Sequence, residues 1–291
     1  MIYLDSSALK SVKHILLVLS GKGGVGKSSV SVQLSLSLLL MGFRVGLLDI
    51  DLTGPSIPYL LGLEGCHIYQ SSSGWVPLHL FINEPSTEMK VVSIGFLLPS
   101  RGDAVIWRGS KKTSMIQQLL SHVEWGVLDF LIIDSPPGTG DEQIAVTETL
   151  HAMNCIKKSH VVVVTTPQEV SLVDVRKGIN FCRKAGLNIY GIIENMSTYI
   201  CPHCSTSTDI FSSGGGEELS ESYQIPLLGK IPLDSTLADL IKCQPASDLN
   251  TSEKIPLSEL VDESNWDLPE RYKKCTLYPL FKEIVNKILE I

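Results

Sequence analysis

The sequence predicts an α/β protein built on a doubly wound, mostly parallel sheet. Seven short runs rich in Val, Ile and Leu alternate with longer segments of helical character. These runs are apolar throughout, as strands covered on both faces of a parallel sheet are. A glycine-rich loop, SGKGGVGKSS at residues 20–29, follows the first run. Such a loop between a strand and a helix is typical of α/β folds that bind phosphate.

The strands can be placed one by one. We expect them, in chain order, at HILLVLS (14–20), RVGLLDI (44–50), VVSIGFL (91–97), LDFLIIDS (128–135), HVVVVTTP (160–167), IYGIIENM (189–196) and PLLGKIP (226–232). The segment 30–38 alternates apolar and polar residues, as a strand would. We nevertheless predict a helix there, because a phosphate loop must open a helix for its free N–H groups to face the anion.

The remaining chain fits one domain. With 291 residues, 44% of them hydrophobic, residues 1–291 can bury a single large core. Residues 244–269 are polar and acidic and contain three prolines, so we expect an excursion there. An apolar stripe at helical spacing predicts a C-terminal helix over residues 277–291.

Composition limits the functional classes. The net charge of −7 does not support a broad nucleic-acid-binding surface. The N-terminus lacks a signal-peptide pattern, and Ser, Gln, Gly and Arg interrupt the most apolar stretch, 30–48, so we expect no membrane association. Five of the seven cysteines are scattered singly, which favours reduced thiols over a secreted disulfide framework. We therefore expect a cytoplasmic protein.

The glycine-rich loop carries the first chemistry. GKGGVGKS, at residues 21–28, matches the pattern GxxxxGK[ST], in which backbone N–H groups approach phosphate oxygens. Lys27 is expected to reach the β- and γ-phosphates of ATP from an exposed loop, and Ser28 to ligate Mg²⁺. The expected cradle is Gly21, Lys22, Gly23, Gly24, Val25, Gly26, Lys27, Ser28 and Ser29. The alternative is a glycine-rich turn without a ligand.

A second lysine, Lys22, makes the loop similar to the deviant Walker A class, which includes MinD, nitrogenase iron protein and arsenite-pump ATPases. The resemblance implies that Lys22 crosses a dimer interface and contacts phosphates bound by the other subunit. It would then neutralise the transition state of hydrolysis only when two subunits close around nucleotide. The alternative for Lys22 is a solvated loop residue.

Acidic residues follow two of the expected strands, where ligands of open α/β sheets gather. LLDID places Asp49 and Asp51 after the second run, and LIID places Asp134 after another. By resemblance to the family, Asp51 would orient or activate the attacking water. Asp134 would hold Mg²⁺ directly or through water, and SPPGTG (135–140) would be a mobile sensor of the γ-phosphate. A strand-end Asp can also be only a turn or cap residue.

The same family pattern suggests adenine contacts at Asn195, in IIENMS, and at Pro232 and Asp234, in KIPLD. A strand-end Asn or a PLD turn can also exist without any ligand.

A CPHC motif places Cys201 and Cys204 late in the chain. Zinc and iron-sulfur centres usually take four ligands, so a symmetric dimer would supply the missing pair of thiolates. His203 is expected to be a spacer. A redox dithiol is the alternative, but that motif usually opens a helix directly after an early strand. We assign no role to the remaining cysteines, Cys66, Cys155, Cys182, Cys243 and Cys275.

The order of the motifs resembles the Mrp/Nbp-type iron-sulfur assembly ATPases between residues 20 and 234. The shared motifs are SGKGGVGKSS, DIDLTGPS, VIWRG, DSPPGTGDE, IIENMS, CPHC and IFSSGGGEELS. Only thirteen residues precede the first expected strand and none is Cys, as in the short cytosolic branch that lacks a four-cysteine extension.

This resemblance implies an ATPase that assembles a labile [4Fe-4S] cluster, bridged by Cys201 and Cys204 of two subunits, for cytosolic and nuclear apoproteins. The implied partners are a second copy or the longer paralogue with four additional cysteines.

Two other functions fit parts of the sequence. A positioning ATPase of the MinD/ParA type would carry a basic amphipathic tail helix, but the charges of the last helix cancel, so we expect that helix to pack on the sheet. Alternatively, CPHC could be a structural zinc clamp between two subunits, since four thiolates suit zinc as well as an iron-sulfur cluster.

Overall fold

A nine-stranded sheet, ordered β10-β9-β8-β1-β7-β2-β6-β5, forms the centre of the molecule, and β11 pairs with the free side of β9. The computed structural model describes residues 8–82, 84–97, 109–201, 204, 206–211, 213–234, 240 and 266–291. Parallel pairing joins the strands β1 (Val12–Ser20), β2 (Val45–Asp49), β6 (Glu84–Ser93), β7 (Leu128–Asp134), β8 (Ser159–Thr165), β9 (Asn188–Ile200) and β11 (Leu227–Leu233).

Antiparallel strands extend this parallel centre. β5 (Leu78–Ile82) pairs with β6 at one edge, and β10 (Ser207–Thr208) pairs with the far end of β9. A separate hairpin joins β3 (Tyr69–Gln70) to β4 (Trp75–Val76). The α/β class and the mostly parallel sheet are confirmed.

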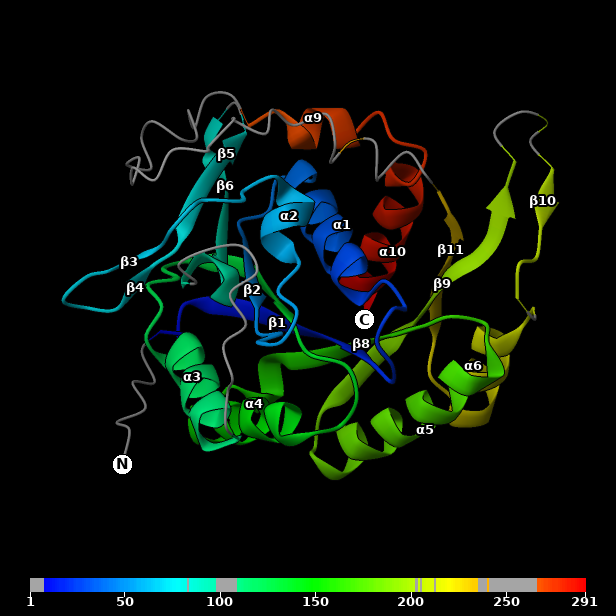
Figure 1. The fold of residues 1–291 in the computed structure, drawn as a ribbon, viewed down its shortest axis with the longest axis horizontal. Coiled ribbons are helices and arrows are strands. Elements are labelled where there is room, and N and C mark those ends of the chain that lie inside the picture. Colours follow the sequence, from blue (N-terminus) through cyan, green and yellow to red (C-terminus); the bar gives the residue numbers. More distant parts are fainter. Residues whose placement is uncertain are drawn as a thin grey trace.

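Helices cover both faces of the sheet (Figure 1). One layer holds α1 (Lys27–Leu40), α2 (Ile57–Leu61), α9 (Leu268–Tyr272) and α10 (Tyr278–Glu290). The other holds α3 (Gly109–Ser121), α4 (Asp141–Ala152), α5 (Glu169–Lys184) and α6 (Gly215–Tyr223). Two short 3-10 helices, η1 (Ile94–Leu97) and η2 (Ile156–Lys158), complete the described elements.

The α1 helix is confirmed, and its packing explains the strand-like alternation of its sequence. It lies between the sheet and the helices α9 and α10, so apolar and polar residues are buried on all sides. The buried serines have hydrogen-bond partners inside the protein: Ser35 Oγ donates to the carbonyl of Ser31 at 2.8 Å, and Ser37 Oγ lies 3.4 Å from the hydroxyl of Tyr272. A helix buried on all sides has no polar face and therefore no 3.6-residue pattern.

The prediction of a strand through residues 91–97 is partly wrong. β6 ends at Ser93, and Ile94–Leu97 form the 3-10 helix η1, with Ile94 and Phe96 buried. An apolar run fits a buried turn as well as a buried strand, so the sequence did not distinguish them.

The C-terminal helix is also confirmed as a packed element. Its buried residues, Phe281, Ile284, Val285 and Ile288, lie at helical spacing, and α10 contacts both β11 and α1. Most of the polar excursion predicted at 244–269 lies outside the described residues, as do Cys243, most of VIWRG, and Pro202 and His203 of CPHC.

Candidate functional site

The glycine-rich loop connects β1, which ends at Ser20, to α1, which begins at Lys27. Gly24 and Gly26 have φ angles of 81° and 82°, a left-handed conformation that glycine adopts without steric cost. Gly26 also lacks space for a side chain, because a Cβ there would lie 2.2 Å from Nδ2 of Asn195. No side chain caps the start of α1, so its first N–H groups are available to an anion.

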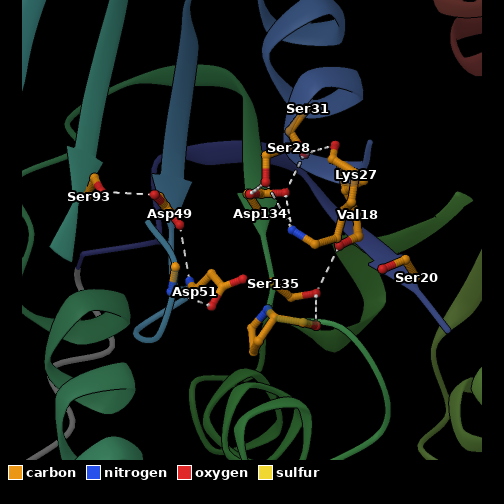
Figure 2. Close-up of polar contacts among 12 residues, drawn as sticks. Val18, Ser20, Lys27, Ser28, Ser31, Asp49, Asp51, Ser93, Asp134 and Ser135 are labelled. Carbon is orange, nitrogen blue, oxygen red and sulfur yellow. Dashed lines mark hydrogen bonds and ion pairs between the residues drawn. The ribbon is translucent and has the colours of Figure 1, made fainter. Parts of the chain in front are cut away.

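Asp134, at the end of β7, gathers three side chains from the start of α1 (Figure 2). Lys27 Nζ lies 2.7 Å from Oδ1 of Asp134. Ser28 Oγ donates to Oδ2 at 2.6 Å, and Ser31 Oγ donates to Oδ1 at 2.7 Å. The expectation that Lys27 lies exposed in a loop is therefore wrong: its side chain is 6% exposed, because it pairs with a fully buried carboxylate.

The donor set around Asp134 fits magnesium. The Ser28 hydroxyl and the Asp134 carboxylate meet directly, and oxygen atoms of these types are the ligands that Mg²⁺ prefers. Ser31, which the sequence analysis did not single out, orients the same carboxylate. Its only sequence signal is its place one helical turn after Lys27.

A second buried carboxylate, Asp49, ends β2 beside Asp134, its register partner on β7. Burial, and then repulsion from Asp134, raise the pKa of Asp49 to about 8. Ser93 Oγ donates to Asp49 Oδ2 at 2.9 Å, and the backbone N–H of Asp51 donates to Oδ1 at 3.1 Å. Through these hydrogen bonds, Asp49 fixes the backbone at Asp51 relative to the neighbouring strand β6.

Asp51 is half-buried and lies in the same region as Asp49 and Ser135 (Figure 2). Its Oδ1 accepts hydrogen bonds from the backbone N–H groups of Thr53 and Gly54, at 3.3 and 3.2 Å, and from the Thr53 hydroxyl at 2.9 Å. The carboxylate therefore shapes its own turn, in addition to any role toward water.

The SPPGTG segment lies against the glycine-rich loop. Ser135 Oγ donates to the carbonyl of Val18 at 2.9 Å, and the N–H of Gly138 donates to that of Ser20 at 2.8 Å. Both acceptors belong to β1, the strand that leads into the loop. SPPGTG is thus hydrogen-bonded to the strand from which the glycine-rich loop starts.

The side chain of Lys22, in the glycine-rich loop, is about one-third exposed. Its Nζ lies 3.7 Å from Oδ2 of Asp174 on α5. The preceding residue, Gly21, packs tightly on the same helix, since a Cβ there would lie 2.6 Å from the backbone nitrogen of Val175. Lys22 thus pairs with a side chain of α5 and remains partly exposed to solvent.

Asn195, Pro232 and Asp234 lie along β9 and β11. Asn195 Nδ2 donates to the carbonyl of Val25 in the glycine-rich loop at 2.8 Å. Ile231 pairs with Asn195, which places Pro232 at the next position of the neighbouring strand. Asp234, after the end of β11, accepts a hydrogen bond from the hydroxyl of Thr276. The three residues therefore share one edge of the site, and Asn195 contacts the loop itself.

Cys201 and Cys204 lie in the sequence between β9 and its antiparallel partner β10, and these two strands extend beyond the helices (Figure 1). Cys201 is half-buried and Cys204 exposed. The N–H of Cys201 donates to the carbonyl of Thr206 at 3.0 Å, and Cys204 Sγ lies 3.2 Å from Thr206 Oγ1. Hydrogen bonding to the Thr206 hydroxyl lowers the pKa of the Cys204 thiol, which favours the thiolate that binds metals.

The other cysteines that the structure describes differ from this pair in being buried. Cys66, Cys155, Cys182 and Cys275 are all buried. Burial raises the pKa of Cys66 to about 11 and that of Cys182 to about 12, so both remain protonated at neutral pH. Within the described part of the chain, no three His, Cys, Asp or Glu side chains form a group that could hold a metal ion. The hairpin therefore presents two thiols.

A doubly wound parallel sheet whose first loop delivers a lysine and a serine to a strand-end aspartate defines a P-loop NTPase. More specifically, the family described as "ParA: NUBPL iron-transfer P-loop NTPase" matches residues 11–262, and the chain belongs to this family.

Relatives extend this finding. Cytosolic Fe-S cluster assembly factor CFD1 of Candida glabrata is 50% identical over 287 residues, covering 99% of this chain and 93% of the relative. Cytosolic Fe-S cluster assembly factor Nubp2 homolog 1 of Drosophila yakuba is 59% identical over 226 residues, covering 78% of this chain and 85% of the relative.

Solved structures agree with the fold. A nucleotide-binding protein from Archaeoglobus fulgidus, in complex with ADP, is 37% identical with a TM-score of 0.68, over 80% of this chain and 87% of that one. MinD from Pyrococcus horikoshii shares the fold, at 21% identity and a TM-score of 0.52, over 92% of this chain and 98% of its own. No helix of the described residues combines the length and apolar character needed to cross a bilayer.

Proposed function

We propose that this protein is an ATP-hydrolysing scaffold that assembles a [4Fe-4S] cluster in the cytosol and transfers it to apoproteins. One observation carries the proposal: strand β9 contacts the phosphate loop through Asn195 and leads directly to the half-buried Cys201 and the exposed Cys204. One strand, β9, thus connects the phosphate loop to the proposed metal-binding cysteines. The names of the CFD1 and Nubp2 relatives support the same function.

The nucleotide site is proposed to bind MgATP. Lys27 would neutralise the β- and γ-phosphates, while backbone N–H groups of residues 21–26 and the start of α1 surround them. Ser28 and Asp134 would hold Mg²⁺, which supplies charge neutralisation for phosphoryl transfer. Asn195, Pro232 and Asp234 would contact the adenine from the β9 and β11 edge.

Hydrolysis is proposed to require two subunits. Lys22 is about one-third exposed and would reach the phosphates of the partner subunit, where it would stabilise charge in the transition state. Asp51 would orient the attacking water from the turn that its own carboxylate shapes. Activity would then depend on protein concentration as well as on nucleotide.

The cluster is the cargo of this scaffold. Cys201 and Cys204 would supply two thiolates, and the same pair from a second subunit would complete the four ligands of a [4Fe-4S] cluster. The second subunit would be another copy or a longer paralogue with four additional cysteines. A cluster held by two residues of each chain would be released more readily than one held by a single chain.

Anaerobic reconstitution with iron and sulfide, followed by a visible spectrum and metal analysis, tests this function. We expect a brown protein with about four irons and four sulfides per dimer, by the usual ligand count. A colourless protein with bound zinc and no acid-labile sulfide would contradict the scaffold and favour the alternative, a positioning ATPase whose CxxC pairs form a zinc clamp. The packed apolar face of α10 argues against the membrane-binding tail of such an ATPase.

A further inference from the structure

Between the phosphate-loop contact and the cysteine pair, strand β9 contains one residue in an unusual conformation. Met196 has a φ of 54°, in the left-handed region of backbone conformation that residues other than Gly, Asn and Asp rarely adopt. It directly follows Asn195 and lies five positions before Cys201. An outlier of this kind inside a strand persists only when its surroundings enforce it.

The pairing with β11 shows what Met196 does to the strand. Asn195 pairs with Ile231, but the next pair joins Tyr199 to Leu233. β9 therefore uses four residue steps where β11 uses two, so a bulge of two extra residues lies in β9 directly after Asn195. A bulge bends its strand and re-aims the residues beyond it.

The residues of β9 that precede this bulge are hydrogen-bonded to the phosphate loop and to α6. Asn195 Nδ2 bonds the carbonyl of Val25, and Glu194, which is 2% exposed, accepts a hydrogen bond from the N–H of Gly216 at 2.6 Å. A Cβ on Gly26 would lie 2.2 Å from Asn195 Nδ2 and 3.6 Å from Cε of Met196. The phosphate loop thus packs against both residues at the bend.

The far side of the bulge carries the cysteine pair. Tyr199 and Ile200 pair with Thr208 and Ser207 of β10. Cys201 and Cys204 are then tied to Thr206 through the hydrogen bonds described above. Because these contacts join the turn to the end of β9, a change of direction at the bulge moves both thiols together.

We propose that Met196 is a positioning residue, a hinge through which the occupied phosphate loop sets the placement of Cys201 and Cys204. The proposal deepens the scaffold function and rests on it. Phosphate binding shifts the backbone of residues 25 and 26. Asn195 moves with the carbonyl of Val25, to which it is hydrogen-bonded. The left-handed conformation of Met196 converts that shift into a rotation of the hairpin. The nucleotide would thereby control how the two thiolates face those of the partner.

The test measures the alkylation rates of Cys201 and Cys204 by iodoacetamide in the apoprotein, resolved by mass spectrometry, without nucleotide and with saturating MgADP or a non-hydrolysable ATP analogue. In the wild type, nucleotide should change these rates by at least about fivefold, the lower end of typical coupling between sites. Met196→Val should lose the response, since a β-branched residue opposes the left-handed conformation. Met196→Gly should keep it, because glycine adopts that conformation freely.

Two further variants separate the hinge from general damage. Gln224→Val changes another left-handed residue, with a φ of 54° at the end of α6, and should respond to nucleotide as the wild type does. Asn195→Ala should lose the change in alkylation rates that nucleotide causes. This variant replaces Met196→Val in the test if Met196→Val does not fold.

Nucleotide affinity is measured in parallel by calorimetry. A wild type that binds nucleotide without changing its thiol rates, or a folded Met196→Val with the full response, would overturn the hinge and leave the scaffold function intact. Failure of the wild type to bind nucleotide would overturn both.

Discussion

Lys27 and Asp134 form a buried ion pair, with Nζ and Oδ1 2.7 Å apart and side-chain exposures of 6% and 0%. The lysine opens α1 and the aspartate ends β7, so the pair joins the phosphate loop to the centre of the sheet. An intact pair of this kind adds little net stability, but losing one partner leaves an uncompensated buried charge. The residue proposed to bind phosphate is therefore also part of the core.

Lys27→Ala is expected to abolish productive MgATP binding and also to destabilise the fold, by about 3–5 kcal/mol. Calorimetric titration with MgATP and urea unfolding measure the two effects. Lys184→Ala, which removes an exposed lysine near the end of α5, is the matched control and should change neither. Nucleotide affinity equal to that of the wild type would contradict the assignment of Lys27.

Lys22→Ala is expected to leave MgATP binding through Lys27 intact but to abolish hydrolysis and nucleotide-stabilised dimerisation. The reason is that Lys22 is proposed to serve the partner's site, whereas Lys27 would bind the nucleotide of its own subunit. Mixing this variant with Asp51→Asn subunits should restore part of the ATPase activity, because in a mixed dimer both lesions fall in the same composite site and the other site is complete. If mixed dimers form and no activity returns at any ratio, Lys22 acts only within its own loop.

Replacing both Cys201 and Cys204 by Ala should remove bound iron and acid-labile sulfide while MgATP binding persists, since Lys27, Ser28 and Asp134 are unchanged. The wild type should hold about one four-iron cluster per dimer. Cys66→Ala, which changes a buried thiol, is the control and should retain the cluster. Wild-type iron and sulfide content in the double variant would refute the scaffold.

Asp129→Asn tests the electrostatics of the sheet away from the nucleotide site. Burial alone would raise the pKa of Asp129, but hydrogen bonds from Arg44 and Lys13 outweigh it and hold that pKa well below its ordinary value of 3.8. At pH 7 the variant should lose about 1.5–3 kcal/mol, as expected for a hydrogen-bonded charge.

The sign of the pH dependence follows from the lowered pKa. The carboxylate stabilises the folded state at pH values above 3.8, and this contribution is lost as the pH falls below that value. Urea unfolding at pH 7, 5 and 3 should therefore show the difference between wild type and variant shrinking only at pH 3. Asp267→Asn removes a more exposed carboxylate, beside Arg271, and should cost at most about 1 kcal/mol.

The strand-end aspartates and helix α1 could be placed from the sequence because they depend on local order. A glycine-rich loop must join a strand to a helix, and apolar runs that end in Asp place those carboxylates at one edge of a parallel sheet. Asp49 and Asp134 accordingly occupy paired positions of β2 and β7.

Other features depend on contacts between distant segments, which local patterns do not encode. Lys27 is buried because Asp134, 107 residues later, lies against it. Ser31 has a role only because the same carboxylate is within its reach. The bulge after Asn195 follows from the register between β9 and β11, and methionine is no signal for a left-handed residue.

The burial of α1 on all sides also bears on how the chain is made. Its outer surface is covered by α9 and α10, and Ser37 Oγ lies 3.4 Å from the hydroxyl of Tyr272. A ribosome adds about 5–20 residues per second, so roughly 12–50 seconds separate the synthesis of α1 from that of α10. During this interval one of the most apolar helices of the protein lacks its final cover. We therefore expect the nascent chain to expose this apolar surface to chaperones, and a chain that stops before α10 to be prone to aggregation.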